Sequence, residues 1–143
     1  MKQKQNCGLL IRQIHNTLEK YSNNQLKKKG LTFSQINVLI QLMETSEKKL
    51  SFKELEKRLT LAQSTTVGLI SRLEEKELVS VSEDKEDKRI KFVGITDLGR
   101  AYCNDAKTEI EQMEDKLLSS LTEKEKKAFY LLLEKVNGDL GKN

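Results

Sequence analysis

Small polar side chains and one arginine share a face of the segment 61–77, and this combination could contact a nucleic acid. On a helix of 3.6 residues per turn, an apolar side is formed by Thr66, Leu69, Ile70 and Leu73. The opposite side carries short polar groups, a glycine and a cation, with Gln63 at its N-terminal rim: Ser64, Thr65, Gly68, Ser71 and Arg72. A helix in the major groove of DNA needs little bulk and groups that reach base edges. The alternative is a merely solvated face, although such faces are usually built from Glu and Lys.

A second charged group lies at residues 83–89, which are too polar to pack in a core. Its cations are Lys85, Lys88 and Arg89. Asp87 stands two residues before Arg89, so on one face of a strand its carboxylate can orient the guanidinium group. An arginine held in this way suits the minor groove, where a narrow width concentrates negative potential. Taken alone, the same run is typical of a solvated loop.

The chain has little material for acid–base, metal or redox chemistry. It contains one histidine, His15, and two cysteines, Cys7 and Cys103, without the spacing of a metal site. We therefore expect no enzyme, no metal and no cofactor. Cys103 is expected to fill an interface, and Cys7 to be a packed or frayed thiol, with a redox-active thiol as the alternative. His15 is expected to be half-exposed, with contact to a ligand as the alternative.

Composition excludes several classes of protein. The 143 residues, 36% hydrophobic and 34% charged, suffice for one ordinary domain, and the absence of proline and low aromatic content argue against a β-sandwich or barrel. The apolar run 129–133 is far shorter than the ~20 residues of a membrane span. The apolar stretch 9–11 is interrupted by Arg12, which argues against a signal peptide, so we expect a cytoplasmic protein. The net charge of +4 permits an anionic partner without demonstrating one.

Helix starts are predicted by capping boxes at Thr32–Gln35, Ser51–Glu54, Thr60–Gln63 and Thr122–Glu125. Apolar periodicity predicts helices over about 5–28, 33–45, 52–58, 61–77, 97–121 and 123–138. The short third helix, tight turn and longer fourth helix are typical of a helix-turn-helix. Residues 78–82 and 90–95 have the β-branched or alternating character of strands, which predicts an exposed hairpin with the charged run at its tip.

The predicted fold is mainly α (α+β), with about six helices and a two- to three-stranded wing hairpin. Residues 1–31 would form an N-terminal helix for dimerisation, 32–96 a winged helix-turn-helix that binds DNA, and 97–143 C-terminal dimerisation helices. Apolar stripes on the terminal helices favour a homodimer, with an internal core as the alternative. Two copies related by a twofold axis would bind a palindrome with half-sites about 10 bp apart.

Four segments occur in an order and spacing that resemble the MarR (multiple antibiotic resistance regulator) family of winged-helix transcription factors. They are Leu31–Gln35, Ser64–Glu74, Asp84–Arg89 and Ile95–Gly99. The resemblance covers residues 5–140 and implies a homodimer that binds a palindromic DNA operator, with the helix over 61–77 in the major groove and the wing arginine in the minor groove. It also implies a repressor with a small-molecule effector. The contacts carried over by position are Gln63, Ser64, Thr65, Ser71, Arg72, Asp87 and Arg89.

Two departures from the family pattern affect the expected DNA contacts. The family commonly has glycine where Glu77 stands, and one or two arginines where Val81 and Ser82 stand. The missing arginines remove phosphate contacts, so we expect weaker binding or a larger share for Arg58 and for lysines of the first two helices. Two alternative functions stay open: a winged-helix module that binds protein, and a redox-sensing regulator that acts through Cys7.

Overall fold

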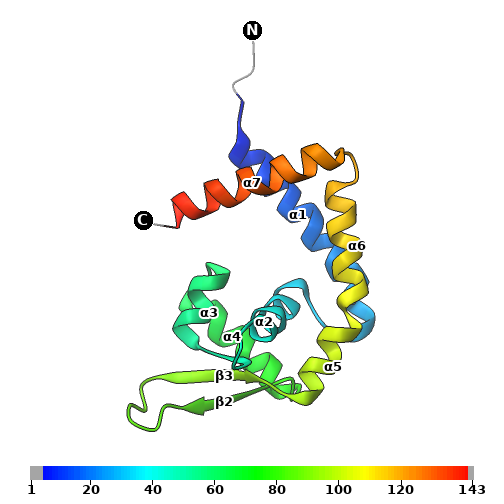
Figure 1. Cartoon of the computed structure of the whole chain (residues 1–143). Coiled ribbons are helices and arrows are strands. Elements are labelled where there is room, and N and C mark those ends of the chain that lie inside the picture. The colour runs from blue at the N-terminus through cyan, green and yellow to red at the C-terminus, as the bar shows by residue number, and fades with distance from the viewer. Residues whose placement is uncertain (1–4, 142–143) are drawn as a thin grey trace. The chain divides into compact units, whose positions relative to one another are not determined.

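The computed structural model describes residues 5–141 and contains a helix-rich fold with one small sheet (Figure 1). The chain divides into two compact units, of which the first ends at Ile110 and the second begins at Glu111. The elements in chain order are α1 (Cys7–Leu26), the 3-10 helix η1 (Lys27–Lys29), α2 (Phe33–Glu44), β1 (Lys49–Ser51), α3 (Phe52–Leu59), α4 (Gln63–Glu75), β2 (Val79–Glu83), β3 (Lys91–Ile95), α5 (Asp97–Asp105), α6 (Lys107–Leu118) and α7 (Glu123–Leu140). This is the predicted winged helix-turn-helix class.

The sheet has three antiparallel strands in the order β1-β3-β2. The hairpin of β2 and β3 with its connecting loop, residues 79–95, is the wing, and in Figure 1 its loop extends beyond α3 and α4. On one face of the sheet, Val93 of β3 lies between Leu50 of β1 and Val81 of β2. Leu50 and Val93 are buried, and this burial anchors the central strand to the helices.

The hydrophobic core of the first unit is built from α2, α3, α4 and the sheet. Its largest fully buried aliphatic side chains are Ile36, Leu39, Leu42, Leu55, Ile70, Leu73 and Leu78. α3 and α4 pack on each other and both pack on α2, while β2 packs on α4. The core therefore fixes α4 from one side only and leaves its other side to solvent.

Three of the four predicted capping boxes are present, and the prediction for Thr60 is wrong. Thr32, Ser51 and Thr122 each accept a hydrogen bond from the amide three residues later, with the reciprocal side-chain bond. Thr60 instead has a left-handed backbone at φ 53° and ends α3. The turn before α4 is so short that Thr60 must terminate one helix, and α4 then starts after Ala62 without a side-chain cap.

The helix predicted over 97–121 is two helices, so the described residues contain seven α-helices rather than six. The break lies at Ala106, whose backbone at φ −82° and ψ −6° stays in the right-handed region but departs from the ideal α-helical ψ. The Ala106 side chain is nevertheless fully buried. Because the apolar spacing continues across the break, periodicity alone predicted one helix.

The second unit contains the remainder of α6 and all of α7. The Thr122 capping box starts α7, and its exposed hydrophobic residues are Tyr130, Leu131, Leu132, Leu133, Val136 and Leu140. Within the part of the chain that the structure describes, no helix has the length and apolar character to cross a membrane.

Candidate nucleic-acid interface

The outer face of α4 carries the residues that its periodicity predicted. Thr66, Ile70 and Leu73 are buried, and the Thr66 hydroxyl donates to the carbonyl of Ala62 at 3.1 Å, so it leaves no unmet polar group in the core. The predicted contact residues are all exposed: Gln63, Ser64, Thr65, Gly68, Ser71 and Arg72. Across residues 5–141, no carboxylate lies within ion-pair distance of Arg72. This face therefore offers small groups, hydroxyls and one cation without an ionic partner.

The C-terminus of α4 ends in a Schellman motif centred on Glu77. The amide of Glu77 donates to the carbonyl of Glu74 at 2.9 Å, and the amide of Leu78 donates to the carbonyl of Leu73 at 3.0 Å. Glu77 has φ 63°, in the left-handed region that favours glycine. Glycine adopts this conformation without strain, and this explains why the family commonly has glycine here. Glu77 adopts the same conformation with strain.

Thr96 joins the base of the wing to the end of α4. Its hydroxyl donates to the Glu77 carbonyl at 2.8 Å and accepts from the Gly99 amide at 3.0 Å, while its own amide donates to the Leu78 carbonyl at 3.1 Å. Gly99 lies so close to this turn that an added Cβ would stand 2.1 Å from the Leu78 carbonyl oxygen. The segment Ile95–Gly99 thus holds the wing in a fixed relation to α4.

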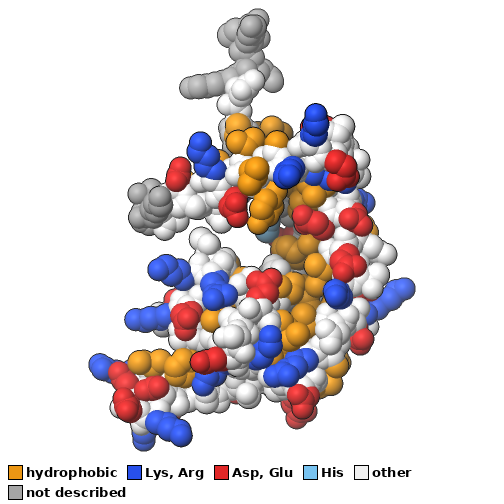
Figure 2. Space-filling model, in the orientation of Figure 1, with side chains coloured by type: hydrophobic (Ala, Val, Ile, Leu, Met, Phe, Trp, Pro, Cys, Tyr) orange, Lys and Arg blue, Asp and Glu red, His pale blue; other side chains and the backbone are white. Residues whose placement is uncertain are grey.

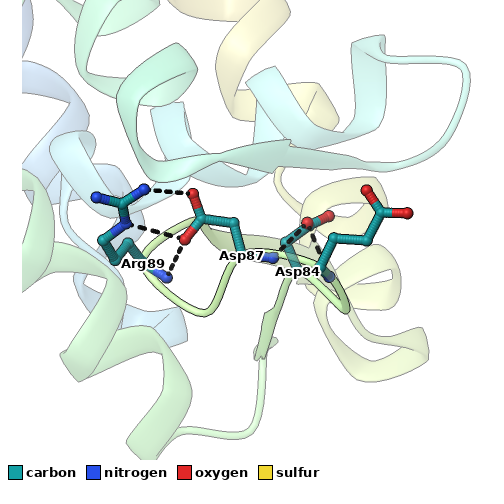
Figure 3. A network of polar contacts seen from close by, with 4 residues as sticks. Asp84, Asp87 and Arg89 are labelled. Carbon is teal, nitrogen blue, oxygen red and sulfur yellow. Dashed lines mark hydrogen bonds and ion pairs between the residues drawn. The ribbon is translucent and has the colours of Figure 1, made fainter.

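In the wing loop, Asp87 holds Arg89 in a bidentate ion pair (Figure 3). Arg89 Nε donates to Asp87 Oδ1 at 3.0 Å and Arg89 Nη2 to Asp87 Oδ2 at 3.1 Å, while the Arg89 amide also donates to Oδ1 at 3.0 Å. Hydrogen bonds from the Arg89 side chain, and then from its backbone, hold the pKa of Asp87 below its ordinary value. The same pair raises the pKa of Arg89. The arginine stays 91% exposed, so its position is set while it remains accessible.

A turn, rather than the strand face that the sequence predicted, brings Asp87 and Arg89 together. Both residues lie in the loop between β2 and β3. The carboxylate of Asp84 accepts from the amides of Glu86 at 3.2 Å and Asp87 at 3.0 Å, and this shapes the loop (Figure 3). The ends of the loop are joined because the Asp84 amide donates to the Ile90 carbonyl at 2.9 Å. Lys85 and Lys88 are exposed in the same loop.

A hollow of about 740 Å³ is lined by the start of α3, by α4 and by the wing. It brings Gln63 of α4 together with Asp87 and Arg89 of the wing. Seven other residues also line it, and the sequence had assigned none of them to the site: Ser51, Phe52, Lys53, Glu56, Val67, Ile90 and Lys91. Val67 could have been found from the helical wheel, because it is an aliphatic residue at the edge of a small polar face. The contribution of Lys53 depends on how α3 packs beside α4, which no local pattern reveals.

The remaining candidate residues lie apart from this surface. Cys7 is exposed at the first residue of α1, so it is not packed, and a redox role for it stays a prediction. His15 is exposed and lies 3.2 Å from the Glu19 carboxylate, and its ring is in a T-shaped arrangement with that of Phe33. The expectation that Cys103 fills an interface is wrong, because its side chain belongs to the core of the first unit. Burial, and then the nearby charge of Glu44, raise the pKa of this thiol.

Comparisons with known proteins agree with this geometry. A sequence model of the MarR family matches residues 29–90. The HTH-type transcriptional regulator SarZ of Staphylococcus aureus is 31% identical over 98 residues, which cover 68% of this chain. The match spans 64% of the length of SarZ.

Solved structures extend the likeness over most of the fold. BpsR of Bordetella bronchiseptica, described with regulation of its DNA binding by 6-hydroxynicotinic acid, is 28% identical, with a TM-score of 0.83 over 91% of this chain and 97% of that one. A mutant of MarR from E. coli complexed with operator DNA is 25% identical, with a TM-score of 0.80 over 90% of this chain and 91% of that one.

Proposed function

We propose that this chain, which belongs to the MarR family, is a transcriptional regulator that binds a specific sequence of double-stranded DNA as a homodimer. One observation carries the proposal. The exposed face of α4, with its small polar residues and Arg72, lies in the same unit as a wing whose Arg89 is oriented by Asp87. To bind in adjacent major and minor grooves, a protein requires a helix and an arginine-bearing loop that are both held in place by the fold.

α4 would lie in the major groove. Gln63, Ser64 and Thr65 stand at its N-terminal end, where recognition helices contact base edges, and Gly68 allows close approach because its Cα carries no side chain. Arg72 follows later on the same face and suits guanine or a phosphate. The wing would reach the neighbouring minor groove with Arg89, and Lys85 and Lys88 would stand close to phosphates.

Homodimerisation is supported by apolar side chains that the single chain leaves exposed on its terminal helices. On α1, Leu9, Leu10, Ile11 and Ile14 are between 40% and 59% exposed. On α7, Tyr130, Leu132 and Val136 are between 50% and 64% exposed. Isolated exposed hydrophobics are common, but rows of them on two helices indicate a buried interface. Two copies of α4 related by a twofold axis would bind a palindromic operator.

The regulator is proposed to act as a repressor whose affinity for DNA is lowered by a small-molecule effector. Among the relatives, BpsR has its DNA binding regulated by 6-hydroxynicotinic acid. An effector acts only if it binds the DNA-competent state and another state with unequal affinity. Titration of the DNA complex with a panel of aromatic acids tests this part separately from DNA binding itself.

Selection of duplexes from fragments of the source genome would identify the operator. Fluorescence anisotropy against the selected palindrome and a scrambled duplex should then show a specificity ratio well above about ten and a steep salt dependence. The variant Arg72→Ala with Arg89→Ala should lose DNA retention while the dimer stays intact. Equal affinity for both duplexes, or indifference to the two arginine substitutions, would favour a protein-binding module instead.

A further inference from the structure

We propose that the hollow between α4 and the wing holds one sugar–phosphate strand of the duplex. Val67 and Ile90 would pack on deoxyribose, while Lys53 and Lys91 would contact the flanking phosphates. This inference rests on the proposed function, and it names four residues that the sequence motifs did not assign. Such a contact with the strand would not depend on the base sequence, whereas contacts from the outer face of α4 would.

The position of the hollow follows from the shape of B-form DNA. The major and minor grooves are separated by a sugar–phosphate strand, so a helix in one groove and a loop in the next must stand on either side of that strand. In this structure, the hollow has Gln63 on the α4 side and Arg89 on the wing side, and the end of β1 and the first turns of α3 complete its lining. When both parts are inserted, one strand must occupy it.

The apolar residues in the hollow match the sugar rather than the phosphate. Val67 is 43% exposed and Ile90 is 42% exposed, and together with Phe52 they form the apolar part of the lining. Hydrophobic side chains lie on the wing next to the charged side chains of its tip in the space-filling view (Figure 2). On the helical wheel, Val67 lies near Gln63 at the edge of the outer face of α4, away from the centre of that face, which is proposed to contact bases. An aliphatic pair at this place can cover the C–H surface of deoxyribose.

The charges in the hollow match the phosphates on either side of that sugar. Lys53 of α3 and Lys91 of β3 are exposed, and across residues 5–141 neither lies within ion-pair distance of a carboxylate. Arg89 is already paired with Asp87, and Glu56 supplies the other carboxylate of the lining. The lining therefore contains two ammonium groups without a carboxylate partner and only one carboxylate without a cation. This balance favours an anionic occupant.

The test uses the full-length protein with two labelled duplexes of about 30 bp, the selected operator and a scrambled sequence, in salt titrations. Lys53→Met and Lys91→Met should each lower the slope of log K against log salt by about one. Val67→Ser with Ile90→Ser should weaken binding to both duplexes by roughly the same factor, about tenfold, without changing the slope, because no counterion is released. Lys107→Met on α6 and Leu98→Ser on α5 are the matched exposed controls, and thermal unfolding verifies that every variant is folded.

The results separate this inference from the proposed function. If Val67→Ser weakens binding to the operator alone, Val67 reads a base and the strand contact is wrong. Wild-type affinity and slope in the lysine variants would also overturn it, while the regulator would still bind DNA through α4. If the wild-type protein binds neither duplex, the proposed function fails, and this inference fails with it.

Discussion

The hydroxyl of Thr96 donates to the carbonyl oxygen of Glu77 at 2.8 Å, and this bond joins the start of α5 to the turn that ends α4. The same hydroxyl caps α5 by accepting from the Gly99 amide. One side chain therefore serves two helix ends, and β2 runs directly from the turn that it holds. The orientation of the wing relative to the proposed recognition helix depends on this turn, so its strain and packing can be tested by substitution.

Replacing Glu77 with glycine should stabilise the fold. Glu77 has φ 63°, a conformation that costs a non-glycine residue roughly 1–2 kcal/mol, while glycine loses part of this gain through its freer unfolded chain. The net gain in the free energy of unfolding should be about 1 kcal/mol, measured by urea denaturation. The matched variant Glu75→Gly replaces the last residue of α4, where the backbone is helical, and should lose stability instead. If both variants gained stability, or neither did, the positive φ of Glu77 would not be the cause.

Replacing Gly99 with alanine should destabilise the fold strongly. The new Cβ would lie 2.1 Å from the Leu78 carbonyl oxygen and 2.8 Å from Ile95 Cγ1, so β2 or α5 must move. We expect a loss of about 3 kcal/mol or more in the free energy of unfolding, measured by the urea midpoint. Gly138→Ala on α7 is the control, because its Cβ would meet nothing within 4 Å and helix propensity should make it neutral or stabilising. A native midpoint for Gly99→Ala would show that the turn adapts without cost.

The ion pair of the wing should be visible in the titration of Asp87. Because bonds from Arg89 depress the folded-state pKa of Asp87 below 3.8, the pair is fully formed at neutral pH and is lost only as the pH falls through that lowered value. Carbon-detected NMR should place the Asp87 midpoint below 3.8, and Arg89→Met should return it toward the ordinary value. Asp87→Asn should also weaken DNA binding at pH 7, since Arg89 loses its bidentate partner. An unchanged Asp87 midpoint in Arg89→Met would show that the two groups do not interact in solution.

The two cysteines should react with a thiol reagent at very different rates. Cys7 is exposed, whereas Cys103 lies in the core, where burial and Glu44 raise the pKa of its thiol. In the native protein at pH 8, one thiol should be modified rapidly and the other only as the chain unfolds. Mass spectrometry of the modified peptides assigns each phase, with Cys7→Ser as the reference that should lose only the fast one. Fast native modification of Cys103 would contradict its place in the core.

The sequence by itself determined the features that depend on neighbouring residues. A capping box joins positions three apart, so Thr32, Ser51 and Thr122 could be predicted as helix starts. The two faces of α4 followed from its helical period, and the Asp87–Arg89 pair from a spacing of two residues. Such features need no knowledge of what lies across the fold.

Only the tertiary structure decided how these parts meet. β1 is three residues long and exists because it pairs with β3, so no local pattern predicts it. Thr60 has the sequence of a cap, but the tight packing of α3 against α4 gives it the left-handed turn instead. Cys103 and Ala106 lie on a continuous apolar stripe, and the core around them decides that both are buried and that the helix breaks there. The hollow beside Val67 and Ile90 likewise arises from segments that are far apart in the chain, because burial and pairing between distant residues set their positions.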